Sequence, residues 1–293
     1  MKFGTMIMGT SFRVMPEVAA IYEENGFESL WVPEHLVFPA VMPPLYPYTD
    51  SGYPVVDPDT PTYDPWVVLA YIAASTSTIR LATNVYILPL RHPLQTARSV
   101  VTVDRVSGGR VTLGIGVGWL PDEFDYLRTS FHDRGKRTDA AIDAIRRLWT
   151  EDEIEVHDDH FDFGPVKFQP KPLQQPSIPI EVGGAAKAAL RRAGALGDGW
   201  IEIGSSDLDE FEAKLAVVMD AREEAGRTGP FEVTAGAGLA GAAGLDGYRR
   251  LEEAGVTRIM TGPPRTEKPP WRVTPETASE WAKQFADNVI AQF

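Results

Sequence analysis

The chain alternates between two hydrophobic patterns along almost its whole length. Short runs rich in β-branched and aromatic residues predict buried strands. Each run is followed by a segment whose apolar residues recur every three to four positions, as on one face of a helix. Eight such pairs follow one another. By residue range, strand first, they are 2–8 with 16–25, 28–32 with 65–75, 79–87 with 93–106, 110–116 with 121–149 (interrupted near 131–135), 178–182 with 186–196, 199–203 with 208–225, 231–235 with 245–254, and 257–261 with 275–290.

Eight consecutive strand and helix pairs predict an α/β fold of the (β/α)8 TIM-barrel type. Each helix would cover the outside of its strand, and the eighth strand would close the sheet on the first. An open, doubly wound parallel sheet is the competing architecture. Nothing in the pattern marks a linker or a second core, so we expect one barrel domain over residues 1–293.

Two insertions interrupt this rhythm. A Pro- and Tyr-rich loop at 34–64 follows the second strand, and the stretch 150–178 before the fifth strand contains a predicted hairpin. Loops that follow barrel strands lie on the catalytic face, so the first insertion is expected to be a lid or an oligomer contact. Its Tyr46, Tyr48 and Tyr53 suggest the wall of an apolar or aromatic pocket.

The residue counts exclude several kinds of chemistry. The chain has no cysteine, which rules out disulfides, thiolate nucleophiles and cysteine metal sites. Its five histidines lack the spacing of a zinc site, so no metal is expected. A formal charge of −13 opposes sequence-independent binding to nucleic acid. With no membrane-length apolar run and no signal-peptide pattern, a cytoplasmic protein without membrane contact is expected.

Candidate chemistry is expected at the C-terminal ends of the strands, where barrel active sites are built. Glycines cluster there. Bare backbone lets a flat or phosphorylated ligand approach and leaves amide N–H groups free as donors, although tight turns also favour glycine. The polar or glycine-rich strand ends are Glu34 and His35, Asn84 and Tyr86, Gly116 to Trp119, Gly183 and Gly184, and Gly204 to Ser206.

His35 is the side chain at these strand ends that titrates near neutral pH, which makes it the candidate for proton transfer. A hydrogen-bonded structural histidine is the alternative. Glu34 beside it is expected to orient the ring or to bind ligand. A GxGxxG spacing at Gly236, Gly238 and Gly241 matches the dinucleotide fingerprint, but no acid ends the next strand, so a simple loop is favoured there.

Several segments together resemble the coenzyme F420-dependent branch of the luciferase-like monooxygenase superfamily. They are LWVPEHL at 30–36, NVYILPLRHPLQTARSVVTVDRVSGGRVTLGIGVGW at 84–119, HDRGKRTD at 132–139, and PLQQPSIPIEVGG with LGDGW within 172–200. The second segment is the most specific. The resemblance covers nearly the whole chain and implies a bacterial-luciferase-like barrel with an isoalloxazine-type ring across the strand ends.

The resemblance also implies roles for individual residues. The family's non-prolyl cis peptide maps to Asn84 and Val85, and its active-site histidine maps to His35. Cofactor contacts are implied at two further groups of positions. Those near the ring are Gly116, Val117, Gly183 and Gly184, and those near the phosphate are Gly204, Ser205 and Ser206.

Two positions depart from better-known relatives. Gly116 stands where bacterial luciferase has a reactive cysteine, and Trp119 stands where the deazaflavin-dependent sugar-phosphate dehydrogenase has a glutamate acid. That enzyme's acid catalysis is therefore not expected here. Trp119 is expected to form a wall of the substrate pocket instead.

The function expected from this resemblance is hydride transfer between coenzyme F420, a deazaflavin, and a small organic substrate. His35 would carry the accompanying proton. A reduced-FMN monooxygenase and a non-catalytic flavin-binding barrel share nearly all of these residues. Arg91 or Arg98 near the ring would favour the more anionic deazaflavin, with an ordinary surface cation as the alternative for each. The family usually forms homodimers or larger homo-oligomers.

A hydrolase unrelated to flavins is the remaining class. It would need paired carboxylates at the strand ends or a metal cluster. Glu34 and Glu202 form a poor pair, because strand alternation is expected to turn Glu202 outward. The sequence therefore favours an oxidoreductase.

Overall fold

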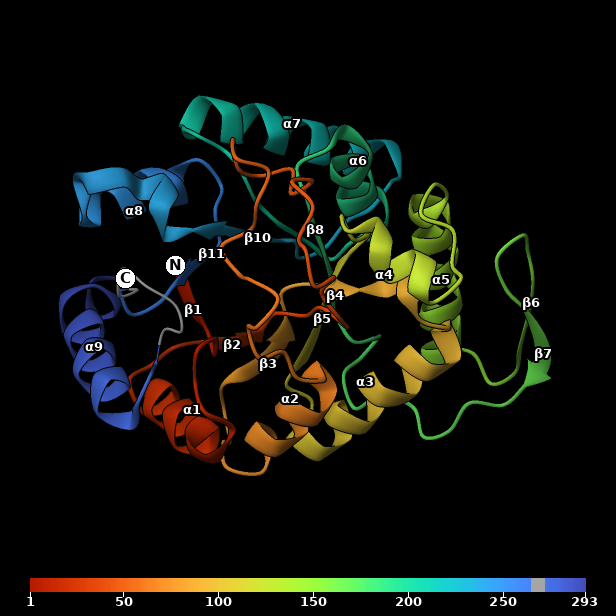
Figure 1. Cartoon of the computed structure of the whole chain (residues 1–293), viewed down its shortest axis with the longest axis horizontal. Helices are drawn as coiled ribbons and strands as arrows, with labels where there is room; N and C mark the ends of the chain where they lie inside the picture. Colours follow the sequence, from red (N-terminus) through yellow and green to blue (C-terminus); the bar gives the residue numbers. More distant parts are fainter. Residues whose placement is uncertain (265–271) are drawn as a thin grey trace.

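Parallel strands form a closed barrel at the centre of the protein (Figure 1). The computed structural model describes residues 1–264 and 272–293. Each strand pairs in parallel with its neighbour, and pairing between β3 and β5 closes the ring. The predicted TIM barrel is therefore confirmed, and the open sheet is excluded. The barrel strands are β1 (Lys2–Met6), β2 (Ser29–Val32), β3 (Arg80–Thr83) continued by β4 (Tyr86–Ile87), β5 (Val111–Gly116), β8 (Ile180–Gly183), β9 (Gly199–Ile201), β10 (Glu232–Gly236) and β11 (Arg258–Thr261).

Helices cover the outside of the barrel and begin or end at capping residues. Asp64 accepts hydrogen bonds from the Trp66 and Val67 N–H groups at the start of α2. Gly108, with φ of 73°, ends α3 in the left-handed region that glycine enters without steric cost. The α-helices are α1 (Met15–Glu24), α2 (Pro65–Ala73), α3 (Pro93–Ser107), α4 (Pro121–Tyr126), α5 (Arg134–Thr150), α6 (Lys187–Leu196), α7 (Leu208–Glu224), α8 (Leu245–Glu253) and α9 (Pro275–Asn288). Short 3₁₀ turns span Phe12–Val14, Leu88–Leu90, Ala237–Ala243 and Ile290–Gln292.

Two predicted elements are divided in the structure. The strand expected over 79–87 is split between β3 and β4. The helical stretch expected over 121–149 is interrupted from residue 127, because α4 ends where Arg128 adopts a left-handed φ of 54°. The hairpin expected within 150–178 is present as β6 (Ile154–His157) and β7 (Asp162–Val166), which pair antiparallel.

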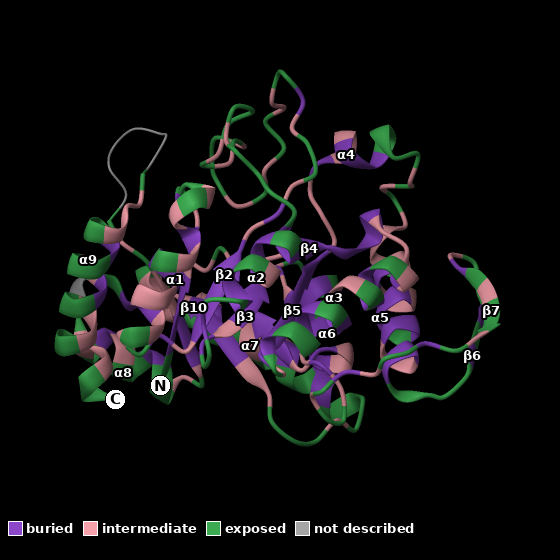
Figure 2. Ribbon diagram, turned by 90° about the horizontal axis from the view of Figure 1, so that it is seen from below, coloured by how far each residue is buried: buried purple, intermediate pink, exposed green. Residues whose placement is uncertain are grey.

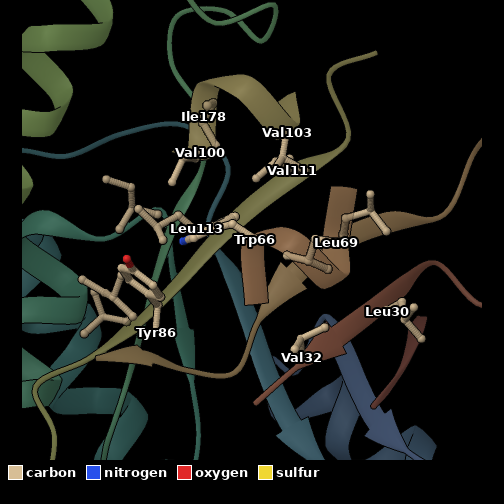
Figure 3. Packing of buried hydrophobic residues seen from close by; sticks show 14 of the residues in the cluster. Leu30, Val32, Trp66, Leu69, Tyr86, Val100, Val103, Val111, Leu113 and Ile178 are labelled. Carbon is tan, nitrogen blue, oxygen red and sulfur yellow. The ribbon is translucent and has the colours of Figure 1, made fainter. Parts of the chain in front are cut away.

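The main hydrophobic core lies between the barrel wall and the surrounding helices (Figure 3). Leu30, Val32 and Leu113 of the strands belong to the same buried cluster as Leu69 of α2 and Val100 of α3. Full burial of such a side chain contributes about 1.5–3 kcal/mol. This packing holds the strand ends in fixed positions relative to one another.

The inside of the barrel is closed below its mouth. Trp31 is fully buried and packs with Ala82 and Ile201 from other parts of the wall. Closer to the N-terminal ends of the strands, Arg258 Nη1 lies 2.9 Å from both carboxylate oxygens of Glu181, and both side chains are buried. The ion pair compensates two charges that burial would otherwise penalise. Inside the barrel, the buried Trp31 ring therefore lies next to the buried Arg258–Glu181 ion pair.

Both insertions stand outside the barrel wall (Figure 2). The loop between β2 and α2, residues 33–64, rises on the same side of the barrel as α4, whereas the β6–β7 hairpin projects from the flank. We call residues 33–64 the lid loop. Across the described residues, no helix is long and apolar enough to cross a membrane.

Candidate functional site

The third barrel strand breaks at its C-terminal end. The peptide between Asn84 and Val85 is cis, as expected from the resemblance. Asn84 N donates to Val32 O at 2.8 Å, and regular pairing resumes at Tyr86, beside Ile115 of β5. Asn84 and Val85 therefore form a bulge at the mouth of the barrel.

Three glycines make room for this bulge. An added Cβ would lie 1.9 Å from Thr83 O at Gly114, 2.5 Å from Val85 Cγ2 at Gly116, and 2.8 Å from Val85 Cγ1 at Gly183. Contacts that short are not tolerated without movement of the backbone or of Val85. The missing side chains of Gly116 and Gly183 thus make room for Val85, and the expected contacts of their backbone groups with a cofactor stay a prediction.

His35 forms a hydrogen-bonded pair with a buried carboxylate. Its Nδ1 lies 2.9 Å from Glu123 Oε2, and the Glu123 side chain is fully buried in the first turn of α4. The other oxygen, Oε1, accepts from the N–H groups of Leu36 at 2.7 Å and Val37 at 3.4 Å. The carboxylate that orients the His35 ring is thus Glu123, and the expectation that Glu34 does so is corrected.

Glu123 is absent from the residues predicted above. It lies 88 positions from His35 in the chain, so no local spacing connects the two. The available signal is an acidic residue in the first turn of a helix that follows a glycine-rich strand end. A sequence pattern of that kind also fits an ordinary helix N-terminus.

Aromatic rings surround His35 beneath the lid loop. The imidazole lies 4.6 Å from the Phe38 ring and 5.6 Å from the Trp119 ring, centroid to centroid. Trp119 meets Tyr46 edge-on at 5.1 Å, and Tyr46 meets Tyr48 at 5.4 Å. Burial raises the pKa of both tyrosines. We call these five residues the lid-covered half of the mouth.

Tyr48 reaches from the lid loop to the ends of two other strands. A Cβ on Gly204 would lie 3.1 Å from Tyr48 Cδ1, and one on Gly184 would lie 3.7 Å from its Oη. Tyr46 and Tyr48 are partly buried, as a pocket wall requires, whereas Tyr53 is 48% exposed. Tyr48 therefore covers two positions at which cofactor contacts were expected.

Glu34 is buried and held inside the protein. Its Oε2 accepts from Ile87 N at 2.8 Å, and its Oε1 forms an ion pair with Arg91. Burial raises the pKa of Glu34 to about 7, while Arg91 and the Ile87 N–H act in the opposite direction. Arg91 is thereby committed to Glu34. Arg98 donates a hydrogen bond to Gln169 O. Both arginines therefore have partners within the protein, which differs from the expected position beside a cofactor ring.

The other half of the mouth contains a cavity of about 550 Å³. Its walls come from the C-terminal ends of β1, β9, β10 and β11, with Asn84 on the side of the bulge. We call this region the open half. Glu202 lines the cavity, which corrects the expectation that it turns outward. Among the described lining residues, Glu202 and Arg272 carry the formal charges.

The glycines of the discounted GxGxxG spacing also border this cavity. Gly236 and Gly238 line it, and a Cβ added at either would meet no other atom within 4 Å. The segment from 237 to 243 is a 3₁₀ turn with a kink at Gly241. The sequence favoured a simple loop here, and the structure shows an ordered 3₁₀ turn instead.

The expected phosphate loop already has carboxylate partners. Ser205 N donates to Glu202 Oε1 and Ser206 N donates to Glu210 Oε2, each at 2.8 Å. Hydrogen bonds from Lys214 and Ser206 lower the pKa of Glu210 to about 2. The two amide groups predicted to meet a phosphate thus bond to acids of this chain.

The remaining predicted contacts lie along the same strand ends. Gly184, with φ of 131°, donates to Ile201 O at 3.3 Å, and its carbonyl accepts from Trp200 Nε1 at 3.0 Å. Val117 is partly exposed just after β5. The structure therefore leaves the Val117 side chain accessible, while both backbone groups of Gly184 have partners within the protein.

Comparisons with known proteins identify a family from sequence and the same fold in solved structures. The family model described as luciferase-like monooxygenase matches residues 1–282. An uncharacterized protein of Mycobacterium tuberculosis is 35% identical over all of both chains. A monooxygenase structure from Streptomyces bottropensis has a TM-score of 0.76 at 22% identity, and covers 100% of this chain and 99% of its own. The coenzyme F420-dependent tetrahydromethanopterin reductase of Methanopyrus kandleri has a TM-score of 0.74 at 18% identity, with the same coverage.

Proposed function

This chain belongs to the luciferase-like monooxygenase family, and we propose that it is an oxidoreductase that transfers a hydride between coenzyme F420 and a small organic substrate. The observation that carries the proposal is the cavity of about 550 Å³ beside the Asn84–Val85 bulge. Pockets for cofactors and small ligands typically measure roughly 300–1,000 Å³. The cavity lies within this range, which supports a bound cofactor there.

The proposal assigns the bound ring to the mouth, next to the bulge. Asn84 and Val85 would support it. Further contacts would come from the strand ends, at Gly116, Val117, Gly183, Gly184, Gly204, Ser205 and Ser206. A phosphate at the last two residues requires Glu202 and Glu210 to release the amide N–H groups that they now accept from. When bound, the deazaflavin supplies a ring carbon that accepts or donates a hydride.

His35 is the proposed proton carrier. Glu123 engages its Nδ1, so Nε2 is the nitrogen that remains for a substrate. In substrate oxidation, Nε2 accepts the hydroxyl proton as the hydride leaves the carbinol carbon. In reduction, the protonated ring returns that proton to the forming hydroxyl group. Trp119, edge-on to the imidazole, forms a wall beside this position.

A second candidate is a reduced-FMN-dependent monooxygenase. Acidic groups at the expected phosphate loop favour it, because the deazaflavin tail is more anionic than that of FMN. Glu202 and Glu210 already bond to that loop. Non-catalytic flavin binding is the third possibility within the same family.

Titration of the purified protein with F420 and with FMN, each oxidised and reduced, separates these candidates by fluorescence. Tighter binding of F420 supports the proposal, tighter binding of reduced FMN supports the monooxygenase, and binding of neither contradicts both. His35→Ala is expected to lower turnover by about 10²- to 10⁴-fold with cofactor affinity nearly unchanged. Unchanged turnover would remove His35 from the mechanism.

A further inference from the structure

Glu123 uses its two oxygens for two different purposes. One contacts the His35 ring, and the other accepts the N–H groups of Leu36 and Val37, the residues that follow His35 in the lid loop. The side chain is completely buried, so this carboxylate has exchanged all of its water contacts for protein contacts. A buried charge is retained at low cost only when such partners are complete.

The geometry constrains the His35 ring. An ionised carboxylate only accepts hydrogen bonds, so the nitrogen that faces it must carry a proton. The 2.9 Å contact joins Glu123 to Nδ1, which leaves Nε2 without a proton in the neutral ring. Ring contacts with Phe38 and Trp119 restrict rotation of the imidazole. One orientation and one tautomer are thus favoured together.

We propose that Glu123 is a positioning residue that holds His35 as its Nδ1–H tautomer and, through the same carboxylate, attaches the start of the lid loop to α4. The first part rests on the proposed function, because an unprotonated Nε2 matters for a base. The second part does not. Release of the loop and loss of the reactive tautomer would then follow from a single side-chain change.

Two substitutions separate these parts. In Glu123→Gln, the amide oxygen can still accept from Leu36 and Val37, while the NH₂ group faces His35 and donates to Nδ1. That donor forces the proton onto Nε2. Glu123→Ala removes both interactions. Asp125→Asn is the matched control, because it makes the same charge change at an exposed position of the same helix.

The decisive measurement is the ¹⁵N spectrum of histidine-labelled protein without cofactor, with the His35 signals assigned from His35→Gln. The expected result is an Nδ1–H tautomer in the wild type and in Asp125→Asn, and an Nε2–H tautomer in Glu123→Gln. An Nε2–H ring in the wild type, or a ring unaffected by Glu123→Gln, overturns the assignment. This measurement does not depend on turnover.

Kinetics and proteolysis complete the test. Glu123→Gln is expected to lower turnover about 10²-fold or more in the wild type and to cause no further loss when His35 is already alanine. Equal losses in both backgrounds would indicate general structural damage instead. If His35→Ala leaves turnover unchanged, the proposed function fails while the tautomer result stands.

Proteolysis tests the attachment of the lid loop. Glu123→Ala, but not Glu123→Gln, should speed cleavage within 33–64, and equal cleavage in both variants contradicts the attachment.

Discussion

The two halves of the barrel mouth differ in the side chains that form them and in how tightly these pack. In the lid-covered half, aromatic rings pack around His35, and the carboxylates of Glu34 and Glu123 are buried with their partners. In the open half, small residues, threonines and methionines line a cavity of about 550 Å³. Under the proposed function, the lid-covered half would hold the proton carrier and the open half would provide room for a ligand.

The two residues of the bulge have different surroundings. Asn84 lines the cavity of the open half, whereas Val85 fills the space beside Gly116 and Gly183. Gly116 ends the strand that leads to Trp119. Substitutions beside Val85 should therefore mainly affect stability, whereas substitutions beside Asn84 in the cavity should mainly affect ligand binding.

The largest expected effect is on the buried ion pair of Glu34 and Arg91, where Glu34 directly precedes His35 of the lid-covered half. Arg91→Met leaves Glu34 without its cation and should cost about 3–5 kcal/mol of unfolding free energy at pH 8. The folded pKa of Glu34, about 7, lies above its unfolded value, so its contribution to stability falls as the pH rises between the two. Loss of Arg91 moves the folded pKa further up. Denaturant unfolding at pH 5 and pH 8 should show a larger deficit at pH 8, and equal deficits contradict this account.

A matched pair of glycine substitutions compares the halves directly. Gly116→Ala places a Cβ 2.5 Å from Val85 and should destabilise the protein by about 1–3 kcal/mol. Gly238→Ala enters empty space and should change the unfolding free energy by less than about 0.5 kcal/mol. Thermal unfolding of both variants measures this contrast. Equal effects would show that the open half is as tightly packed as the other.

A larger side chain at the same open position tests the proposed binding role. Gly238 borders the cavity, so the larger side chain of Gly238→Leu should weaken cofactor binding about tenfold or more, which corresponds to roughly 1.4 kcal/mol. The melting temperature without cofactor should stay near that of the wild type. Unchanged affinity would place the cofactor outside the open half.

The smallest expected effect concerns the cover of the lid-covered half. Tyr48→Ala removes the ring beside Gly204 and should raise the rate of proteolytic cleavage within 33–64 by a few-fold. Global stability should change little, because the loop lies outside the barrel wall. Tyr53→Ala, at an exposed position of the same loop, is the control.

The barrel elements and the two insertions could be predicted from the sequence pattern, whereas the exact residues at which elements break could not. Strand and helix patterns predicted the order and type of the barrel elements, because each depends on neighbours within a few residues. The early end of α4 depends on a left-handed φ at Arg128, a non-glycine residue with no local signal for that conformation. The turn at 237–243 was expected as a loop because the next strand lacks the acid of the dinucleotide fingerprint, a test that does not exclude an ordered turn.

The candidate site was predictable only as a set of strand ends. His35 and the Asn84–Val85 peptide could be placed from motif resemblance. The partners that define their surroundings come from distant segments, as Glu123 does for His35. Glu202 shows the same limitation, since its direction depends on how β9 ends and on the Ser205 N–H group that it accepts from. Burial and pairing of this kind are properties of the assembled barrel.

The layers of Trp31 and Arg258 beneath the mouth have a consequence for the order of events. Among the described residues, these side chains fill the barrel axis below the mouth, so a ligand that entered along this axis would come from the mouth. If two ligands bound one above the other in this cavity, the outer ligand would bind last and would have to dissociate first.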